Sequence, residues 1–229
     1  MLKNYIVVAL RSIRKQKGLA VINVFGLGCG IALCLLIMLF NRDELTYDRF
    51  HDDHESIHRV ERFYYDADRG FRSNSINDNL MLPTALKADI PEVRAASIFF
   101  NRTSYLQINQ ERSQESTEEN ILFAGAEFLD VFSFKLMQGD PASALRDPKN
   151  IILSAAAAKK HFGDANPVGE VVQILVAGEY RDFVVSAIAE NHPENSTIKF
   201  DAIARYERYV DLDQELQPLK DSWSLNYAA

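Results

Sequence analysis

The apolar segment from Leu19 to Phe40 limits the possible folds of this chain more than any other feature. It is 22 residues long, LAVINVFGLGCGIALCLLIMLF, with no charged side chain and one strongly polar residue, Asn23. At 1.5 Å per residue, a helix of this length rises about 33 Å, enough to cross a hydrocarbon core of about 30 Å. We therefore predict a transmembrane helix over residues 19–40.

A cleaved signal peptide is the main alternative for this segment, because it is N-terminal and follows basic residues. The apolar region of a signal peptide usually has about 7–15 residues and leads to a small-x-small cleavage site. Here the apolar run is longer and passes directly into Asn41, Arg42, Asp43 and Glu44. The pattern favours an uncleaved anchor.

Charge is distributed very unevenly on the two sides of the segment. Residues 1–18 carry +5 and no acidic residue, whereas the whole chain carries −7, so residues 41–229 carry −12. Lys and Arg mark the cytoplasmic side of a membrane helix. We therefore expect a cytoplasmic N-terminus and an acidic domain on the other side of the membrane. In a bacterium this is the far side of the inner (cell) membrane, in the periplasm or at the cell surface. Nucleic-acid binding, which needs a basic surface on the folded domain, is not expected.

Small residues recur along the predicted helix at Gly26, Gly30 and Cys34. This i, i+4, i+8 spacing allows another helix to approach closely, although glycine is also common in membrane helices generally. Residues 2–17 place several apolar side chains on one helical face, which favours a short interfacial helix over an ordinary basic flank. Since Cys29 and Cys34 both lie in the membrane segment, the external domain has no cysteine for a disulfide or a metal site.

Residues 41–229 alternate irregularly between short strand and helix patterns, which predicts a mixed α/β (α+β) domain with a partly antiparallel sheet. Ser154 is the expected N-cap of one helix and Gly163 its end. Residues 110–119 are polar and are expected to form a loop or a hairpin tip, and residues 200–210 fit either a strand or a helix. We predict strands over residues 57–66, 93–101, 104–109, 121–125, 151–153, 171–176 and 183–189, and helices over residues 43–55, 79–88, 126–132 and 155–162. The last two strands flank residues 177–180, which predict a hairpin.

Most polar residues of the domain have a structural explanation. His161 and His192 are isolated and are expected to be structural or exposed. Carboxylate groups are expected on solvated faces, and three phenylalanines in a turn-rich stretch are expected in the core. These carboxylates are Asp52, Asp53, Glu55, Glu115, Glu118 and Glu119, and the phenylalanines are Phe128, Phe132 and Phe134.

One stretch matches a zinc-hydrolase motif literally. His54-Glu55-Ser56-Ile57-His58 reads H-E-x-x-H, which on a helix places two imidazoles on one face, and His51 is a possible further ligand. The predicted strand beginning at Ile57 would remove that helical geometry, and no later helix offers a convincing third ligand. We expect no catalytic residue, no cofactor and no metal site.

Four stretches, spread along the chain in order, match one family. The chain opens with LKNYIVVALRSIRKQKGLAVINVFGLGCGIA and continues with DELTYDRFH and IHRV, then AEFLDVFSFKLMQGDPASALRDPKNIILSAAAAKKHFGDANPVGE, then VVSAIAENHPENSTIKFDAI. Together they resemble the MacB/FtsX-like family of ABC transporter permeases, particularly the long form of Bacteroidetes-type bacteria. The region that they resemble is the first transmembrane helix plus the MacB-like periplasmic core domain.

The resemblance implies a permease subunit that binds no nucleotide itself. Such a subunit pairs with a separate cytoplasmic ABC ATPase, works as a homodimer or paired permease, and relays ATPase dimerisation through its membrane helices to the periplasmic domain. Family members continue into further membrane helices, so the chain is expected to be the N-terminal part of a permease. The alternatives are a membrane-anchored interaction or sensor domain without transport activity and, more distantly, the zinc hydrolase.

Overall fold

The computed structural model describes Tyr5, Arg11 and residues 14–66, 68, 70–75, 79–108, 116–214 and 216–217. By internal contacts the chain divides into two compact units, Met1–Tyr47 and Asp48–Ala229. Most of the interfacial helix predicted over residues 2–17 lies outside the described residues. The same is true of residues 110–115 of the predicted loop.

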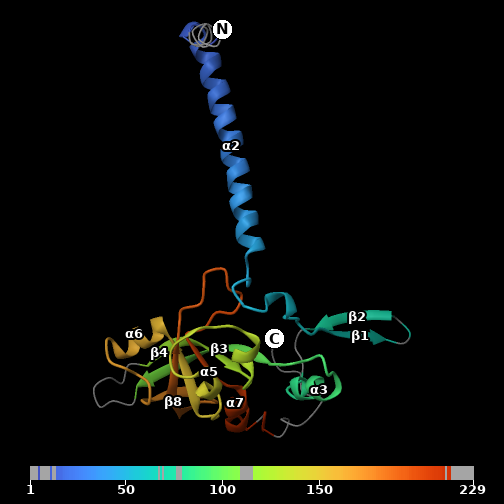
Figure 1. Cartoon of the computed structure of the whole chain (residues 1–229), viewed down its shortest axis with the longest axis vertical. Helices are drawn as coiled ribbons and strands as arrows, with labels where there is room; N and C mark the ends of the chain where they lie inside the picture. The colour runs from blue at the N-terminus through green and yellow to red at the C-terminus, as the bar shows by residue number, and fades with distance from the viewer. Residues whose placement is uncertain are drawn as a thin grey trace. The chain divides into compact units, whose positions relative to one another are not determined.

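The first unit is dominated by the long helix α2 (Lys17–Leu45), which contains the whole predicted membrane segment (Figure 1). None of its residues is buried within the unit, and Ile22, Phe25 and Phe40 expose 67–72% of their surface. A helix that is apolar all round needs lipid or other helices to cover it. By length and composition, α2 is the candidate membrane span in the described part of the chain.

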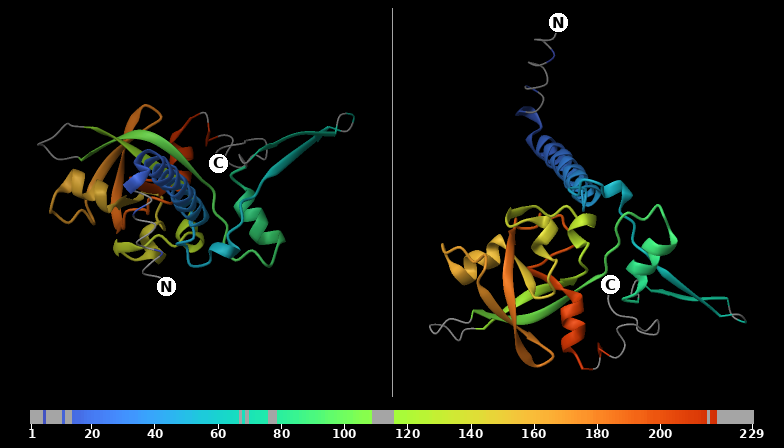
Figure 2. Two further views of the ribbon diagram at one scale, coloured as in Figure 1. Left: turned by 90° about the horizontal axis from the view of Figure 1, so that it is seen from above. Right: turned by 60° about the horizontal axis from the view of Figure 1, so that its bottom comes forward.

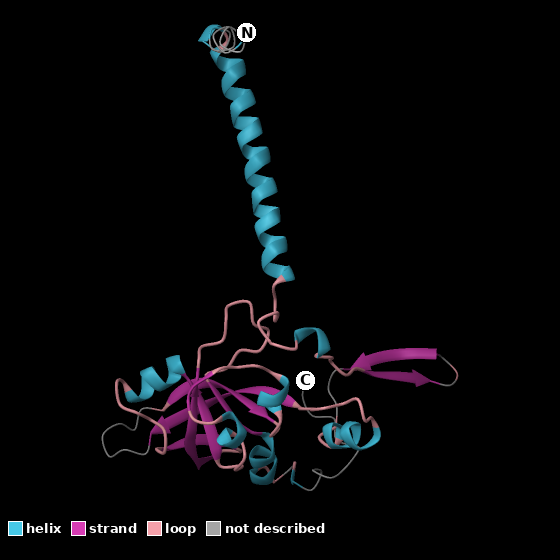
Figure 3. Ribbon diagram, in the orientation of Figure 1, coloured by secondary structure: helices cyan, strands magenta, loops and turns pink. Residues whose placement is uncertain are grey.

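In its described residues, the second unit has two sheets (Figure 3). The smaller is an antiparallel hairpin of β1 (Arg62–Asp66) and β2 (Gly70–Ser75). The larger has the order β5-β8-β6-β9-β4-β3-β7, and β7 also pairs with β8. Six strands therefore close into a ring, which we call the barrel, and β5 is attached outside it to β8. The strands are β3 (Phe99–Ile108), β4 (Thr117–Ala124), β5 (Leu136–Gln138), β6 (Asn150–Ser154), β7 (Val171–Val176), β8 (Glu179–Ala189) and β9 (Ala202–Arg205).

Pairing in the larger sheet is mixed. The β4–β9 and β6–β8 pairs are parallel, and its other pairs are antiparallel. The β7–β8 hairpin turns at Ala177 and Gly178, whose φ values of 50° and 84° are those of a two-residue I′ turn. Both the predicted fold class and this predicted hairpin are confirmed.

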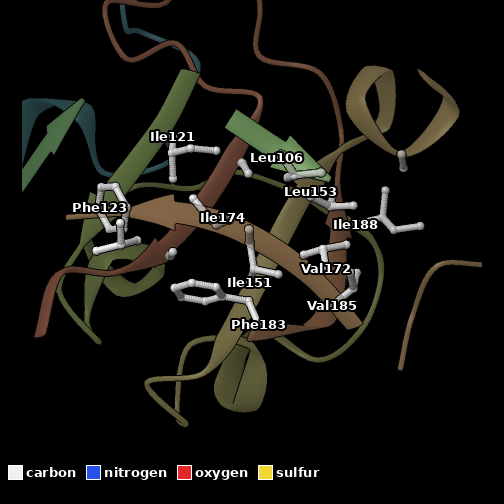
Figure 4. Packing of buried hydrophobic residues seen from close by; sticks show 14 of the residues in the cluster. Leu106, Ile121, Phe123, Ile151, Leu153, Val172, Ile174, Phe183, Val185 and Ile188 are labelled. Atoms are coloured by element: carbon white, nitrogen blue, oxygen red, sulfur yellow. The ribbon is translucent and has the colours of Figure 1, made fainter. Parts of the chain in front are cut away.

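The core has an inner and an outer part because successive side chains of a strand point to opposite faces. On β4, Ile121 and Phe123 belong to the cluster inside the barrel, whereas Leu122 and Ala124 belong to the cluster outside it (Figure 4). The outer cluster includes Phe128 and Phe134, both buried, and Phe132 packs against it. The three phenylalanines therefore lie in or against the core, as predicted.

Two helices close the ends of the barrel (Figure 2). The first, α6 (Ala155–Phe162), follows β6, while α7 (Tyr206–Leu212) follows the antiparallel strand β9, so they cover opposite ends. The Ser154 side chain accepts the Ala157 N–H at 3.1 Å, and Gly163 ends α6 with a φ of 63°, both as predicted. The shorter helices are η1 (His54–Ser56), α3 (Leu82–Asp89), α4 (Phe128–Val131) and α5 (Pro141–Ala144).

Several predicted boundaries were wrong. The helix over residues 43–55 does not form, because α2 ends at Leu45 and Asp48 takes a φ of 55°, outside the helical range. The strand predicted over residues 57–66 begins only at Arg62, and the strands over residues 93–101 and 104–109 are one strand, β3. Residues 200–210 hold both alternatives, β9 and then most of α7.

Candidate functional site: the entry segment of the barrel domain

The histidine motif does not have the helical geometry that its spacing would need to bind zinc. His54–Ser56 is a single 3₁₀ turn and Ile57 is extended, so His54 and His58 do not share a helical face. Within the described ranges, no group of three or more His, Cys, Asp or Glu residues could hold a metal ion. The expected loss of helical geometry at Ile57 is confirmed.

The small residues predicted to pack against another helix all lie on α2. Gly26, Gly30 and Cys34 are exposed, and a Cβ atom built on either glycine would meet no atom within 4 Å. The surface therefore has room for a second helix at these positions. Helix packing through them stays a prediction.

The entry segment, residues 48–56, is the first part of the barrel unit that the chain reaches after α2. Asp48 attaches it to the loop between β8 and β9 by two hydrogen bonds. Its N–H donates to the Asn195 carbonyl at 3.1 Å, and its Oδ1 accepts the Thr197 N–H at 2.8 Å. Asp48 therefore joins the start of the entry segment to the loop that precedes β9.

His51 attaches the same segment to the loop between α4 and β5. Its Nδ1 accepts the Ser133 N–H at 3.1 Å, and in return the Asp52 N–H donates to the Ser133 Oγ at 3.1 Å. The His51 ring is 3% exposed and packs against Phe50, Phe132 and Phe134, with ring centroids 4.0–5.3 Å apart.

We call the hydrogen bonds that hold the entry segment the clasp. The bonds are made by Asp48, His51 and Asp52 on one side and by Ser133, Asn195 and Thr197 on the other. Sequence reasoning offered His51 only as a possible zinc ligand. Its buried role could have been inferred from the neighbouring Phe50, because an apolar side chain in a turn-forming stretch indicates packing.

A buried ion pair connects α6 to the barrel. The Glu119 Oε1 accepts hydrogen bonds from the His161 Nε2 and the Lys160 Nζ, both at 2.7 Å. The expectation that Glu119 lies on a solvated face was wrong, since it is 4% exposed. Glu119 points to the same face of β4 as Ile121 and Phe123, toward the inside of the barrel. The positive charge of Lys160 on α6 lies beside it. His161 has the structural role expected of it.

The described residues combine an N-terminal apolar helix, long enough to cross a membrane, with a closed mixed barrel. The family described as the MacB-like periplasmic core domain matches residues 20–226. The chain therefore belongs to this family, which is the periplasmic core domain of MacB/FtsX-type ABC permeases.

Three solved structures resemble the chain at low identity. A domain of a permease protein from Porphyromonas gingivalis has a TM-score of 0.54 and 23% identity, with 67% of this chain and 66% of that chain covered. The periplasmic region of MacB from Actinobacillus actinomycetemcomitans has a TM-score of 0.46 and 17% identity, with 62% of this chain and 61% of that chain covered. The extracellular domain of the ABC-type transporter YknZ from Gram-positive bacteria has a TM-score of 0.40 and 16% identity, with 62% of this chain and 65% of that chain covered.

The first of these likenesses supports the fold alone. The chain spans about two thirds of that structure's length, 66%. No curated protein matches the chain.

Proposed function

We propose that this chain is the N-terminal part of the permease subunit of a MacB/FtsX-type ABC transporter. In this role it couples ATP hydrolysis by a separate cytoplasmic ATPase to conformational change or export in the periplasm, and catalyses no reaction itself. The observation that carries the proposal is the family match over residues 20–226, which takes in most of the apolar helix together with the barrel domain. The charge of +5 on residues 1–18 supports a cytoplasmic N-terminus and a periplasmic barrel.

The link between helix and barrel suits a mechanical role. Thr46 and Tyr47 alone separate the end of α2 at Leu45 from Asp48. The Thr46 N–H and Oγ1 both donate to the Asp43 carbonyl, which continues the helix end as a turn. Because so short a link leaves little slack, we expect a movement of α2 to be passed on to the clasp.

The test is recovery of an ABC ATPase with the full-length membrane protein from its native host in mild detergent. We expect an ATPase to co-purify in a constant ratio, and ATP hydrolysis in the purified complex. If no ATPase is recovered from membranes in which the protein is intact, the transporter proposal fails. A membrane-anchored interaction or sensor domain then becomes the better account.

We also propose that the subunit self-associates through the face of α2 that carries Gly26 and Gly30. The double change Gly26→Leu/Gly30→Leu should weaken self-association roughly tenfold, equivalent to about 1.4 kcal/mol, because leucine keeps the helix backbones apart. Energy transfer between labelled copies in detergent micelles measures this. Gly28→Leu is the matched control, since Gly28 is also free of neighbours but points to another side of the helix. Unchanged self-association of the double variant would remove this interface.

A further inference from the structure

The clasp depends on a histidine that is neutral when the clasp is closed. Because the His51 Nδ1 accepts the Ser133 N–H, that nitrogen carries no proton, and the neutral ring has its proton on Nε2. In the described part of the chain, Nε2 is buried and has no hydrogen-bond partner. A second proton would have to go to Nδ1, where it would face the Ser133 N–H and break the bond.

The surroundings of the ring also oppose a positive charge. Burial is the largest influence and lowers the pKa of His51 below its ordinary value of 6.5. Asp48 and Asp52 act in the opposite direction, and His54 adds to the lowering. These groups all belong to the entry segment. The residues of the α4–β5 loop that contact the ring, Phe132, Ser133 and Phe134, do not titrate. The pKa of His51 is lowered overall, so the charged imidazolium form is disfavoured while the clasp is closed.

We propose that protonation of His51 opens the clasp, so that the entry segment is held to the barrel at neutral pH and released in acid. Opening exposes the ring to water and frees Nδ1. In the open form Nδ1 can therefore bind a proton, which it cannot do while it accepts the Ser133 N–H. The same step releases the Ser133 N–H, and the entry segment loses its hydrogen bond at His51, close to its attachment at Asp48. The opening does not depend on the proposed transport function, although its use in the cell would rest on the proposed periplasmic location.

The sign of the pH dependence follows from proton linkage. Well above pH 6.5 His51 is neutral in both forms, so pH does not affect the equilibrium. Below pH 6.5 the open form binds more protons, and opening is favoured by up to about tenfold for each pH unit. The effect levels off once the pH falls below the lowered pKa of the closed form.

Hydrogen exchange on the full-length protein in nanodiscs, between pH 7.5 and pH 5, tests the proposal. After correction for the intrinsic pH dependence of exchange, the amides of Asp52, Ser133 and Thr197 should keep constant protection well above pH 6.5. Below pH 6.5 their protection should fall by up to about tenfold for each pH unit. Constant protection of these amides down to pH 5 would overturn the proposal.

Two matched variants identify the titrating group. In His51→Asn the amide oxygen can still accept the Ser133 N–H but cannot titrate, so the pH dependence should vanish. In His54→Asn, a change at an exposed neighbour, it should persist. Persistence in His51→Asn overturns the proposal.

A direct titration of the His51 ring by NMR keeps the test decisive if His51→Asn does not fold. The ring should titrate below pH 6.5, together with the loss of amide protection. A ring that becomes charged while the Ser133 amide stays protected would contradict the proposal.

Discussion

Replacing Gly139 by alanine is expected to destabilise the barrel domain by roughly 2–4 kcal/mol. Gly139 has a φ of 95°, a region that residues with a side chain rarely adopt. A Cβ atom there would lie 2.5 Å from the Ala187 Cβ and 2.7 Å from the Ser186 carbonyl oxygen. These atoms belong to β8, which is held within the sheet and cannot easily move away. Chemical denaturation of the full chain in detergent, followed by circular dichroism, measures the loss.

Gly169→Ala separates the effect of crowding from the effect of backbone conformation. Gly169 has nearly the same φ, 93°, but a Cβ atom there would meet nothing within 4 Å. It should therefore cost only the backbone strain, about 1–2 kcal/mol. Equal losses for the two variants would show that the close approach of Gly139 to β8 has no energetic consequence.

Replacing Phe123 by alanine should cost about 3–5 kcal/mol, the loss typical of a large aromatic side chain removed from a packed core. Phe123 is fully buried inside the barrel. Its ring stacks on Phe100 at 5.6 Å and lies 4.7 Å from the ring of Tyr209 on α7. The truncation would leave a cavity where α7 closes the barrel, so the contacts of that helix should weaken as well. The same denaturation measurement applies.

Phe63→Ala on β1 is the control for this truncation. It removes the same side chain from a position that is 53% exposed, and should change the free energy of unfolding by less than about 1 kcal/mol. If Phe123→Ala costs no more than Phe63→Ala, the interior of the barrel is not packed as described.

The elements predicted correctly are those specified by local signals. The apolar run of residues 19–40 is long enough to identify a helix by itself, and α2 contains it. Ser154 and Gly163 mark the two ends of α6 through capping and a positive φ. The β7–β8 hairpin depends on the two residues of its turn.

The features that were missed depend on contacts between distant residues. Closure of the barrel needs β7 to pair with both β3 and β8, and strand composition does not indicate which edges meet. Glu119 looked solvated because its partners, Lys160 and His161, are about 40 positions away. His51 was read as a possible ligand because Ser133, which its Nδ1 binds, lies 82 positions further on.

Family membership could be predicted from the sequence because the matching stretches lie in order along the whole chain, and the match over residues 20–226 confirms it. The clasp could not be predicted, although its main residues lie inside those stretches. Asp48 and His51 fall within DELTYDRFH, and Ser133 falls within AEFLDVFSF. The order of the stretches identifies the family but not the pairs of residues that meet in the fold.

A label on the barrel domain that reports its response to ATP tests the central claim most directly. Asp164 suits this, because its side chain is 94% exposed. Asp164→Cys can be labelled after the native cysteines of the full-length protein, Cys29 and Cys34 among them, are replaced by alanine. In nanodiscs that contain the full-length protein and its ATPase, ATP should change the label's fluorescence. An ATPase variant that binds but does not hydrolyse ATP should hold the changed state. If the complex hydrolyses ATP while the label does not respond, the barrel domain is not driven by the ATPase and the account is contradicted.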